Sequence, residues 1–307
     1  MFEYSLDNKR YHTLNYHMKS IFGERVFKAS IDARMTCPNI DGRVGFGGCT
    51  FCASGADEFT GKGRVSQQIE NERERIRKKH PDAKLIAYFQ AHTNTYAPLG
   101  ILRSLYEEAL SQKGVVGISI ATRPDCIADD VSELLADLSE KTYLTVELGL
   151  QSVHDRTAER INRGYSFDVF EKTFYKLKDK KIRTCVHLIN GLIGEDTADM
   201  IKSAEVLSKM EPDAVKLHLL HIMRGTVCEK EYEKGLLSAL SKEEYVNIVV
   251  EQIRRLDPRC VIERVTGDGK REELIAPLWS RAKISVLAAI DKRFAELDAY
   301  QGDKFNK

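Results

Sequence analysis

The sequence lacks the features that mark several large classes of protein. None of its apolar runs approaches the ~20 residues that a membrane-spanning helix needs. Its opening residues, MFEYSLDNKRYH, contain no apolar stretch like that of a secretory signal peptide. It also has no internal repeat, no low-complexity tract and no linker rich in Pro or Ser. We therefore expect a cytoplasmic protein without a membrane segment, whose cysteines stay reduced.

An excess of charge of one sign is missing as well. The 47 Lys and Arg residues face 46 Asp and Glu residues, which gives a net charge of +1. This balance excludes a nucleic-acid-binding protein that is strongly basic throughout, although a local basic face remains possible. The chain is 42% hydrophobic and 30% charged, as globular proteins are and disordered ones are not. Its 307 residues suffice for one or two domains that bury a core without disulfides.

Short apolar runs rich in β-branched residues alternate with longer amphipathic stretches along the first two thirds of the chain. The runs predict strands at 26–32, 84–90, 115–122, 143–151, 182–190 and 214–220. The amphipathic stretches predict helices at 66–80, 99–112, 129–140, 168–180 and 197–210. Strands that alternate with helices predict a parallel sheet with right-handed crossovers. Because six units fall short of eight, we predict an α/β fold, a partial (β/α)6 barrel of the TIM type.

The pattern changes after residue 221. Helices are predicted at about 227–236, 242–256 and 278–297, with a short strand near 260–265. We therefore divide the chain into an N-terminal segment (1–25), a barrel core (26–221) and a mostly helical C-terminal extension (222–307). The extension is expected to pack on the barrel instead of forming an independent domain.

The seven cysteines are unevenly distributed. Cys37, Cys49 and Cys52 fall within the segment CPNIDGRVGFGGCTFC, whereas the other four are scattered along the chain. Close spacing of cysteines in a reducing compartment indicates a metal site or a redox couple. Three thiolates can hold three irons of a 4Fe-4S cluster and leave the fourth iron without a protein ligand. The alternative is a structural zinc site, completed by His80 or His92.

Polar side chains gather where the predicted strands end. In parallel α/β sheets the working residues lie at the carboxyl ends of the strands. The segment after the second strand carries His92, Asn94 and Tyr96, which we predict to contact substrate. At the end of the third strand, Arg123 and Asp125 are expected to form a structural ion pair.

The cysteine spacing, Cys37-x11-Cys49-x2-Cys52 directly after a first strand, resembles the radical S-adenosylmethionine (SAM) superfamily. Its first spacer is longer than in the commonest motif of that superfamily. The segment VELGLQSVHDRTAERINRGYS is similar to the branch of the Elongator catalytic subunit and to oxygen-independent coproporphyrinogen oxidases. Six segments together resemble the bacterial YhcC/YtqA family over nearly the whole chain: CPNIDGRVGFGGCTFC, YFQAHTNTYAP, ISIATRPDC, HLINGLIGE, KLHLLHIMRGT and RVTGDG.

This resemblance implies an enzyme with a radical SAM barrel and two cofactors, one 4Fe-4S cluster and SAM. The cluster would be held by Cys37, Cys49 and Cys52, and SAM would bind its open iron and be cleaved to a 5′-deoxyadenosyl radical. By position in the related branches, SAM would contact Gln151, Arg163, His187, Glu147, Gly191 and Gly194. Of these, His187 falls where the coproporphyrinogen oxidases have an acidic residue.

The resemblance also implies a substrate. YtqA-like members resemble MnmL, an enzyme of tRNA wobble-uridine modification that converts 5-carboxymethylaminomethyluridine to 5-aminomethyluridine. The expected partners are tRNA and an electron donor of the flavodoxin or ferredoxin type, with no DNA. Arg264 and Asp268, in RVTGDG, are predicted to meet the substrate. Two alternatives stay open: a radical SAM enzyme of a small metabolite or peptide, and a zinc-stabilised RNA-binding protein without catalysis.

The segment 8–28, NKRYHTLNYHMKSIFGERVFK, mixes basic and aromatic side chains. Such mixtures are typical of surfaces that bind single-stranded RNA. An ordinary solvated helix has a similar composition. Both interpretations of this segment are therefore retained.

Overall fold

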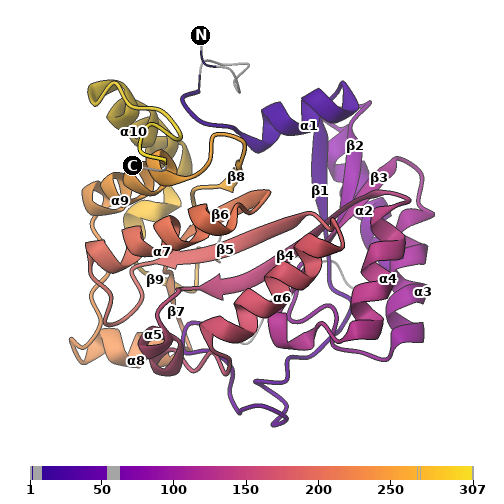
Figure 1. Ribbon diagram of the computed structural model, residues 1–307, viewed down its shortest axis with the longest axis horizontal. Coiled ribbons are helices and arrows are strands. Elements are labelled where there is room, and N and C mark those ends of the chain that lie inside the picture. Colours follow the sequence, from indigo (N-terminus) through magenta and orange to yellow (C-terminus); the bar gives the residue numbers. More distant parts are fainter. Residues whose placement is uncertain (1, 3–8, 54–62, 268, 270, 306–307) are drawn as a thin grey trace.

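A seven-stranded parallel sheet forms the centre of the protein, whose computed structural model describes residues 2, 9–53, 63–267, 269 and 271–305. The sheet curls into an open half-barrel (Figure 1), which confirms the predicted partial barrel. Its strands follow one another in chain order, β1-β2-β3-β4-β5-β6-β8. They are β1 (Val26–Ile31), β2 (Lys84–Phe89), β3 (Val115–Thr122), β4 (Tyr143–Gln151), β5 (Thr184–Asn190), β6 (Ala214–Leu219) and β8 (Val261–Arg264).

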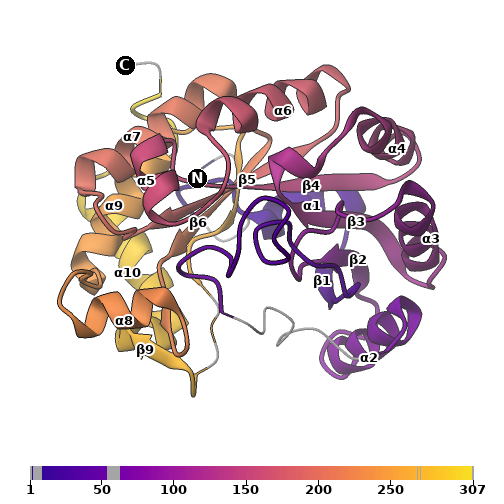
Figure 2. The same cartoon turned by 90° about the horizontal axis from the view of Figure 1, so that it is seen from below.

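Helices cover the outer face of the sheet (Figure 2). Each of the five predicted helices of the barrel forms within a few residues of its expected ends, because each has an apolar stripe that packs on the strands. The Ser166 side chain caps α6, and Asp196 and Asp199 form a capping box on α7. The helices are α2 (Val65–Arg77), α3 (Leu99–Leu110), α4 (Asp129–Ser139), α6 (Phe167–Asp179) and α7 (Thr197–Met210).

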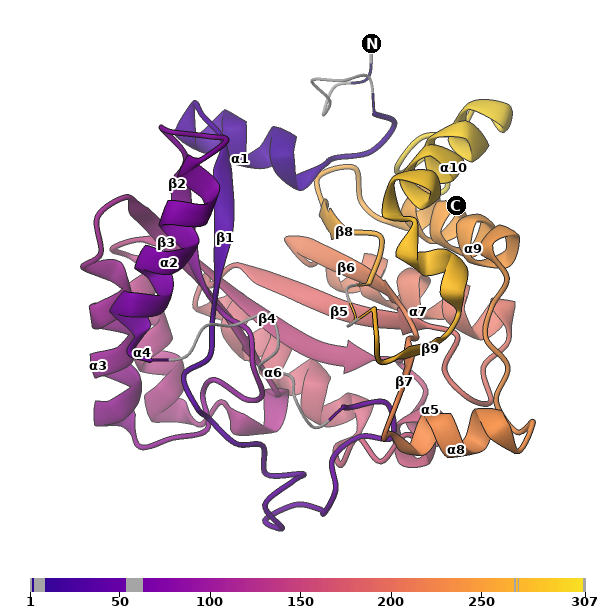
Figure 3. The same cartoon turned by 180° about the vertical axis from the view of Figure 1, so that it is seen from behind.

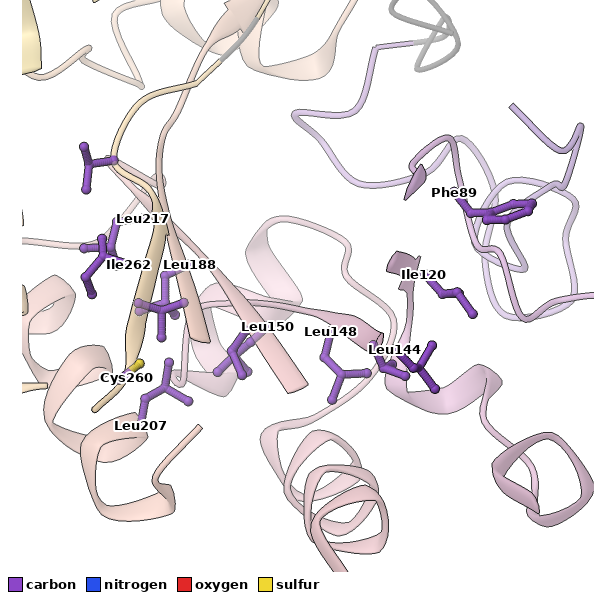
Figure 4. Close-up of a cluster of buried hydrophobic side chains, with 14 of the residues drawn as sticks. Phe89, Ile120, Leu144, Leu148, Leu150, Leu188, Leu207, Leu217, Cys260 and Ile262 are labelled. Carbon is purple, nitrogen blue, oxygen red and sulfur yellow. The ribbon is translucent and has the colours of Figure 1, made fainter. Parts of the chain in front are cut away.

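The two faces of the sheet differ in chemistry. Along β4, Leu144, Leu148 and Leu150 join the core between the sheet and the helices. Figure 4 shows that this core continues along the sheet through apolar side chains of β5, β6 and β8, among them Leu188, Leu217 and Ile262. Because side chains alternate along a strand, the odd-numbered residues of β4 point to the interior of the half-barrel, and two of them, Glu147 and Gln151, line a cavity there. The inner face is therefore polar.

The seventh strand comes from the C-terminal extension, which the six-strand prediction did not include. β8 pairs in parallel with β6, with Ala214 opposite Val261. The predicted short strand near 260–265 is present, but its spacing along the chain gave no sign of its partner. The rest of the extension comprises α8 (Val227–Glu233), α9 (Lys242–Arg255), which packs on α7, α10 (Lys283–Glu296), which packs on α9, and an antiparallel pair, β7 (Ile222–Met223) with β9 (Leu274–Ala276).

The basic and aromatic segment forms α1 (Leu14–Phe22) followed by β1. α1 contacts both β1 and β8, and Thr13 bridges to Ile262. It thus lies across the gap between the first and last strands, at the end of the half-barrel opposite the loop of 32–53 (Figure 3). In the part of the chain that is described, no helix has both the length and the apolar character that crossing a bilayer requires.

Candidate functional site

The loop between β1 and α2 carries three cysteines across the carboxyl ends of the strands (Figure 2). It starts as a tight turn in which the Ile40 N–H donates to the Cys37 carbonyl at 2.8 Å. At Gly42, φ is +93° and an added Cβ would lie 2.5 Å from the Phe46 ring, so the turn favours glycine there. Further on, the Cys52 N–H donates to the Cys49 carbonyl at 2.9 Å, which fixes these two cysteines in one turn.

Distant elements hold this loop in place. The Thr50 N–H donates to the Ile161 carbonyl at 2.9 Å, just after the short helix α5 (Asp155–Arg160), which the sequence did not predict. The Thr50 carbonyl accepts from the Cys228 N–H at 3.1 Å, at the start of α8. The cysteine loop is therefore docked on both the barrel and the C-terminal extension.

The three thiols border one cavity, of about 450 Å³, which we call the barrel cavity. Burial, together with the neighbouring Cys52 and Cys37, raises the pKa of Cys49 to about 12, against the Arg123 charge. Burial and Cys37 likewise raise the pKa of Cys52. Each thiol thus lies within electrostatic range of another, and the thiolate form needs a positive partner.

These thiols fit a group large enough to span them. Within the described ranges, no three His, Cys, Asp or Glu side chains converge closely enough to hold a single metal ion. A four-iron cluster accepts three thiolates at different corners. Of the two histidines considered for a zinc site, His92 lines the barrel cavity, whereas His80 stacks on Phe27 at 4.9 Å and does not line it.

Glu147 is the centre of a buried network on the inner face. Its side chain is fully buried, and its two oxygens accept hydrogen bonds from five donors. Burial raises its pKa, but the Lys216 and Lys28 ammonium groups outweigh burial and hold the pKa well below its usual range. Glu147 is therefore ionised. The donors are Lys28 (2.6 Å) and Ser119 (2.7 Å) on Oε1, and Tyr88 (2.9 Å), His187 (2.8 Å) and Lys216 on Oε2.

The network continues to the seventh strand. Lys28 also donates to Glu263 Oε2 at 2.7 Å, so two buried carboxylates and two lysines compensate one another. Burial of charges without such pairing costs several kcal/mol per ion. Because β8 supplies Glu263, the extension takes part in the electrostatics of the barrel interior.

The structure brings three of the predicted SAM residues to the barrel cavity: Gln151, His187 and Glu147. Gln151 has a left-handed backbone with φ of +62°, and its Oε1 accepts from the Tyr165 hydroxyl at 3.3 Å. Burial and the Lys216 charge lower the pKa of His187, against its hydrogen bond to Glu147. His187 is therefore neutral at pH 7.

The structure does not bring the other three predicted SAM residues to the cavity wall. Arg163 is fully buried, and its guanidinium donates to the carbonyls of Ser152 at 2.7 Å, Tyr165 at 3.0 Å and Leu150. It braces the turn after β4, because a buried cation needs several acceptors. Gly191 and Gly194 both have positive φ and shape the loop after β5, outside the cavity lining.

Of the predicted substrate residues, some line the barrel cavity and others do not. His92 and Arg264 line the barrel cavity. Asn94 does not, because it is fully buried and its amide donates to the carbonyls of Phe89, Ala91 and Ala121. Tyr96 borders a separate cavity and stacks on the Arg43 guanidinium. Asp268 lies outside the described residues.

The expected ion pair is confirmed and has a second role. Arg123 binds Asp125 through two hydrogen bonds, of 2.9 and 2.7 Å. Its remaining nitrogen donates to the Arg163 carbonyl at 2.9 Å and lies 4.0 Å from Cys37 Sγ. The pair thus fixes a positive charge beside the cysteine loop.

Several residues of the cavity wall were not predicted from the sequence. They are Tyr88, His218 and His221, with Lys28 and Lys216 behind them. A sequence pattern could have predicted them. A Lys or His at every second position of an apolar run, as in KLHLL, indicates a strand with one polar face. His221 is also packed closely, because a Cβ on Gly267 would lie 2.7 Å from its ring.

Comparison with known families agrees with this geometry. The family described as the radical SAM superfamily matches residues 41–207, and the radical SAM C-terminal domain matches residues 212–296. The protein YtqA of Bacillus subtilis is 47% identical over 309 residues, which cover 100% of this chain and 96% of that protein. The protein YhcC of Escherichia coli is 36% identical over 278 residues, which cover 90% of this chain and 89% of that protein.

More distant relatives share part of the chain or only its fold. Elongator complex protein 3 of Mus musculus is 28% identical over 160 residues, half of this chain and 28% of that protein. Among solved structures, the archaeal Elp3 of Methanocaldococcus infernus has a TM-score of 0.65 at 19% identity, covering 87% of this chain and 63% of that one. Methylornithine synthase has a TM-score of 0.52 at 15% identity, covering 94% and 87%. At these identities the two structures show the fold alone.

Proposed function

Because this chain belongs to the radical SAM superfamily, we propose that it cleaves SAM reductively and uses the resulting radical on the wobble uridine of tRNA. The reaction would convert 5-carboxymethylaminomethyluridine to 5-aminomethyluridine. The observation that carries the proposal is that three thiols and a polar inner face border one cavity. Its volume, about 450 Å³, lies within the range of small-molecule sites.

Cys37, Cys49 and Cys52 would hold a 4Fe-4S cluster. When bound, this cluster supplies the electron that cleaves SAM to methionine and a 5′-deoxyadenosyl radical. The chain's own contribution is to favour ligation, because Arg123 lowers the pKa of Cys49 against the effect of burial. The docked turn around Thr50 keeps the thiols beside the cavity that would hold SAM.

SAM would be oriented by residues of the cavity wall. A carboxylate only accepts hydrogen bonds, so the Gln151 amide N–H₂ group would be the donor for the carboxylate of SAM, with the Tyr165 hydroxyl 3.3 Å from Gln151 Oε1. Arg163 would not contact SAM itself but would brace the turn that positions Gln151. His92 and Arg264, on the same wall, are the proposed contacts to the substrate.

A base of tRNA would have to leave its stack to enter this cavity. Enzymes that act on a base turn it out, at a cost of a few kcal/mol that is least for unpaired bases. A wobble base in an anticodon loop is unpaired, so this cost is small. The tRNA backbone would then remain outside, at the open mouth of the half-barrel.

Two measurements test the proposal. Anaerobically purified protein is expected to contain about four irons, to bleach on reduction and to release 5′-deoxyadenosine from SAM. Mass spectrometry of tRNA nucleosides from cells lacking the gene should show 5-carboxymethylaminomethyluridine accumulating while 5-aminomethyluridine disappears. Adding the purified enzyme to that tRNA should reverse the change.

The outcomes separate the alternatives. SAM cleavage with unchanged wobble nucleosides would overturn the tRNA substrate and favour a small metabolite or peptide. One equivalent of zinc without iron would favour an RNA-binding protein without catalysis. Cys49→Ala should abolish SAM cleavage and leave the chain folded. Cys126→Ala, which alters a thiol outside the barrel cavity, is the matched control.

A further inference from the structure

The hydrogen bond between His187 and Glu147 has only one possible direction. Glu147 is ionised by its two lysines, and an ionised carboxylate only accepts. Nε2 of His187 lies 2.8 Å from Glu147 Oε2 and must therefore be the protonated nitrogen. The partner of one ring nitrogen sets the state of the other.

The opposite nitrogen of the ring faces the cavity side. His187 lines the barrel cavity with 19% of its side chain exposed. Within the part of the chain that the structure describes, Nδ1 of His187 makes no hydrogen bond, and it is not among the buried polar atoms that lack a partner. This nitrogen is therefore accessible from the cavity. In a neutral ring protonated on Nε2, it carries a lone pair.

The surroundings keep the ring neutral. Lys216 and Lys28 both pair with Glu147, the hydrogen-bond partner of the ring, and His218 packs against the ring with centres 5.2 Å apart. Glu147 and Glu263 balance the two lysines, so a further proton on His187 would be an uncompensated charge. Tyr88 and Ser119 occupy further positions on Glu147 and prevent it from rotating away.

We propose that Glu147 is a positioning residue that locks His187 in the Nε2–H form, so that Nδ1 accepts a hydrogen bond from a hydroxyl group of a nucleoside bound in the barrel cavity. The inference rests on the proposed function, because both of its ligands, SAM and a uridine of tRNA, are nucleosides. A locked Nδ1 accepts hydrogen bonds as a carboxylate does, without adding negative charge.

The test measures the ring itself. The full-length, metal-free chain is labelled with ¹⁵N-histidine, and His187 is assigned among the eight histidines by its absence in His187→Gln. At pH 7 we expect a protonated Nε2 and an unprotonated Nδ1. Glu147→Gln should lose this preference and give a mixture of the two forms. His154, which is not part of the cavity wall, is the internal reference and should not change.

Ligand addition distinguishes the two nucleoside sources. 5′-Deoxyadenosine is added in one arm and 5-carboxymethylaminomethyluridine in the other, and the Nδ1 signal should shift with the ligand that donates to it. His187→Leu should weaken binding of that ligand about tenfold, and His187→Gln, which retains an acceptor, should restore part of it. Circular dichroism and thermal unfolding of each variant show that it is folded.

The possible failures are distinct. A protonated Nδ1 at pH 7, a Glu147→Gln variant with unchanged ring nitrogens, or an Nδ1 signal unmoved by both ligands would each overturn the inference. None of these results requires the cluster or turnover, so an enzyme that cleaves SAM could still fail this test. Conversely, the ring could have the expected protonation while the protein does not cleave SAM. That result would support the positioning role of Glu147 and overturn the proposed function.

Discussion

The side-chain amide of Asn39 donates a hydrogen bond to the backbone carbonyl of Asn162 at 2.6 Å and joins parts of the chain that are 123 residues apart. Asn162 has a left-handed backbone with φ of +53° and donates in turn to the Gly48 carbonyl at 2.8 Å. The Asn39 amide also lies 3.8 Å from Cys49 Sγ. The turn after α5 therefore clamps the cysteine loop, a contact that no sequence pattern predicts.

Asn39→Ala should loosen this clamp. We expect a loss of about 1–2 kcal/mol in the free energy of unfolding, because a buried hydrogen bond is removed and the Asn162 carbonyl loses a donor. Alkylation of Cys49 should become faster, since its burial decreases. Rates followed by peptide mass spectrometry, with Asn71→Ala on the exposed face of α2 as control, check this. Equal rates in the two variants would show that the clamp does not order the loop.

Lys216→Met should destabilise the protein by about 3 kcal/mol, because it leaves Glu147 with less compensating charge in a buried position. Adding Glu147→Gln to this variant should recover part of the loss. Lys172→Met, which removes an exposed pair with Asp168, should cost less than about 0.5 kcal/mol. Urea unfolding of the four proteins measures the differences. A double variant less stable than Lys216→Met alone would contradict the network.

Gly267→Ala should disturb the wall of the barrel cavity. Its Cβ would lie 2.7 Å from the His221 ring, so either the ring or the loop after β8 must shift. We expect a loss of about 1–3 kcal/mol in stability, as is usual for overpacking. Gly100→Ala is the control, because nothing lies within 4 Å of the added atom and alanine favours helix α3 by up to about 1 kcal/mol. Opposite signs for the two variants are the expected result of thermal unfolding.

His17 should contribute a pH dependence to folding. Burial, Arg183 and His12 lower its pKa from 6.5 to about 4, against Glu263, and its Nε2 lies 3.1 Å from the Tyr143 hydroxyl. The unfolded chain therefore binds more protons than the folded one between pH 4 and 6.5, so stability falls as the pH falls through this window. At pH 5, this difference in proton binding lowers the free energy of unfolding by about 1–2 kcal/mol. His17→Gln should reduce the difference in unfolding free energy between pH 5 and pH 7, and an unchanged difference would refute the assignment.

The elements of the barrel were largely predictable from the sequence. The six predicted strands and five predicted helices formed close to their expected bounds, because periodicity and caps are local properties. β8 was predicted as a strand but not as a member of the sheet, since β7, α8 and α9 separate it from β6 and interrupt the alternation of single strands and helices. α5 and the β7–β9 pair are too short to give a periodic signal.

The candidate site, like the fold, was predictable from the sequence only in part. The three cysteines, Gln151 and His187 were identified by spacing and resemblance, and they border one cavity. Arg163 and Asn94, which were also predicted to meet ligands, donate to backbone carbonyls and do not line that cavity. A polar residue near a strand end has the same sequence signature in both roles. The ligand-binding role and the bracing role are distinguished only in the structure, by whether backbone carbonyls lie within hydrogen-bonding distance of the side chain.

The sequence by itself determined the spacing of the three thiols and the alternation of polar and apolar side chains along the strands, because both are set by the order of residues. The tertiary structure alone decided how the inner face is charged. Lys28, Glu147, Lys216 and Glu263 come from four different strands, and their ion pairs exist only because the sheet curls and brings those strands around one interior. Charge compensation depends on distance in space, which the order of residues does not contain.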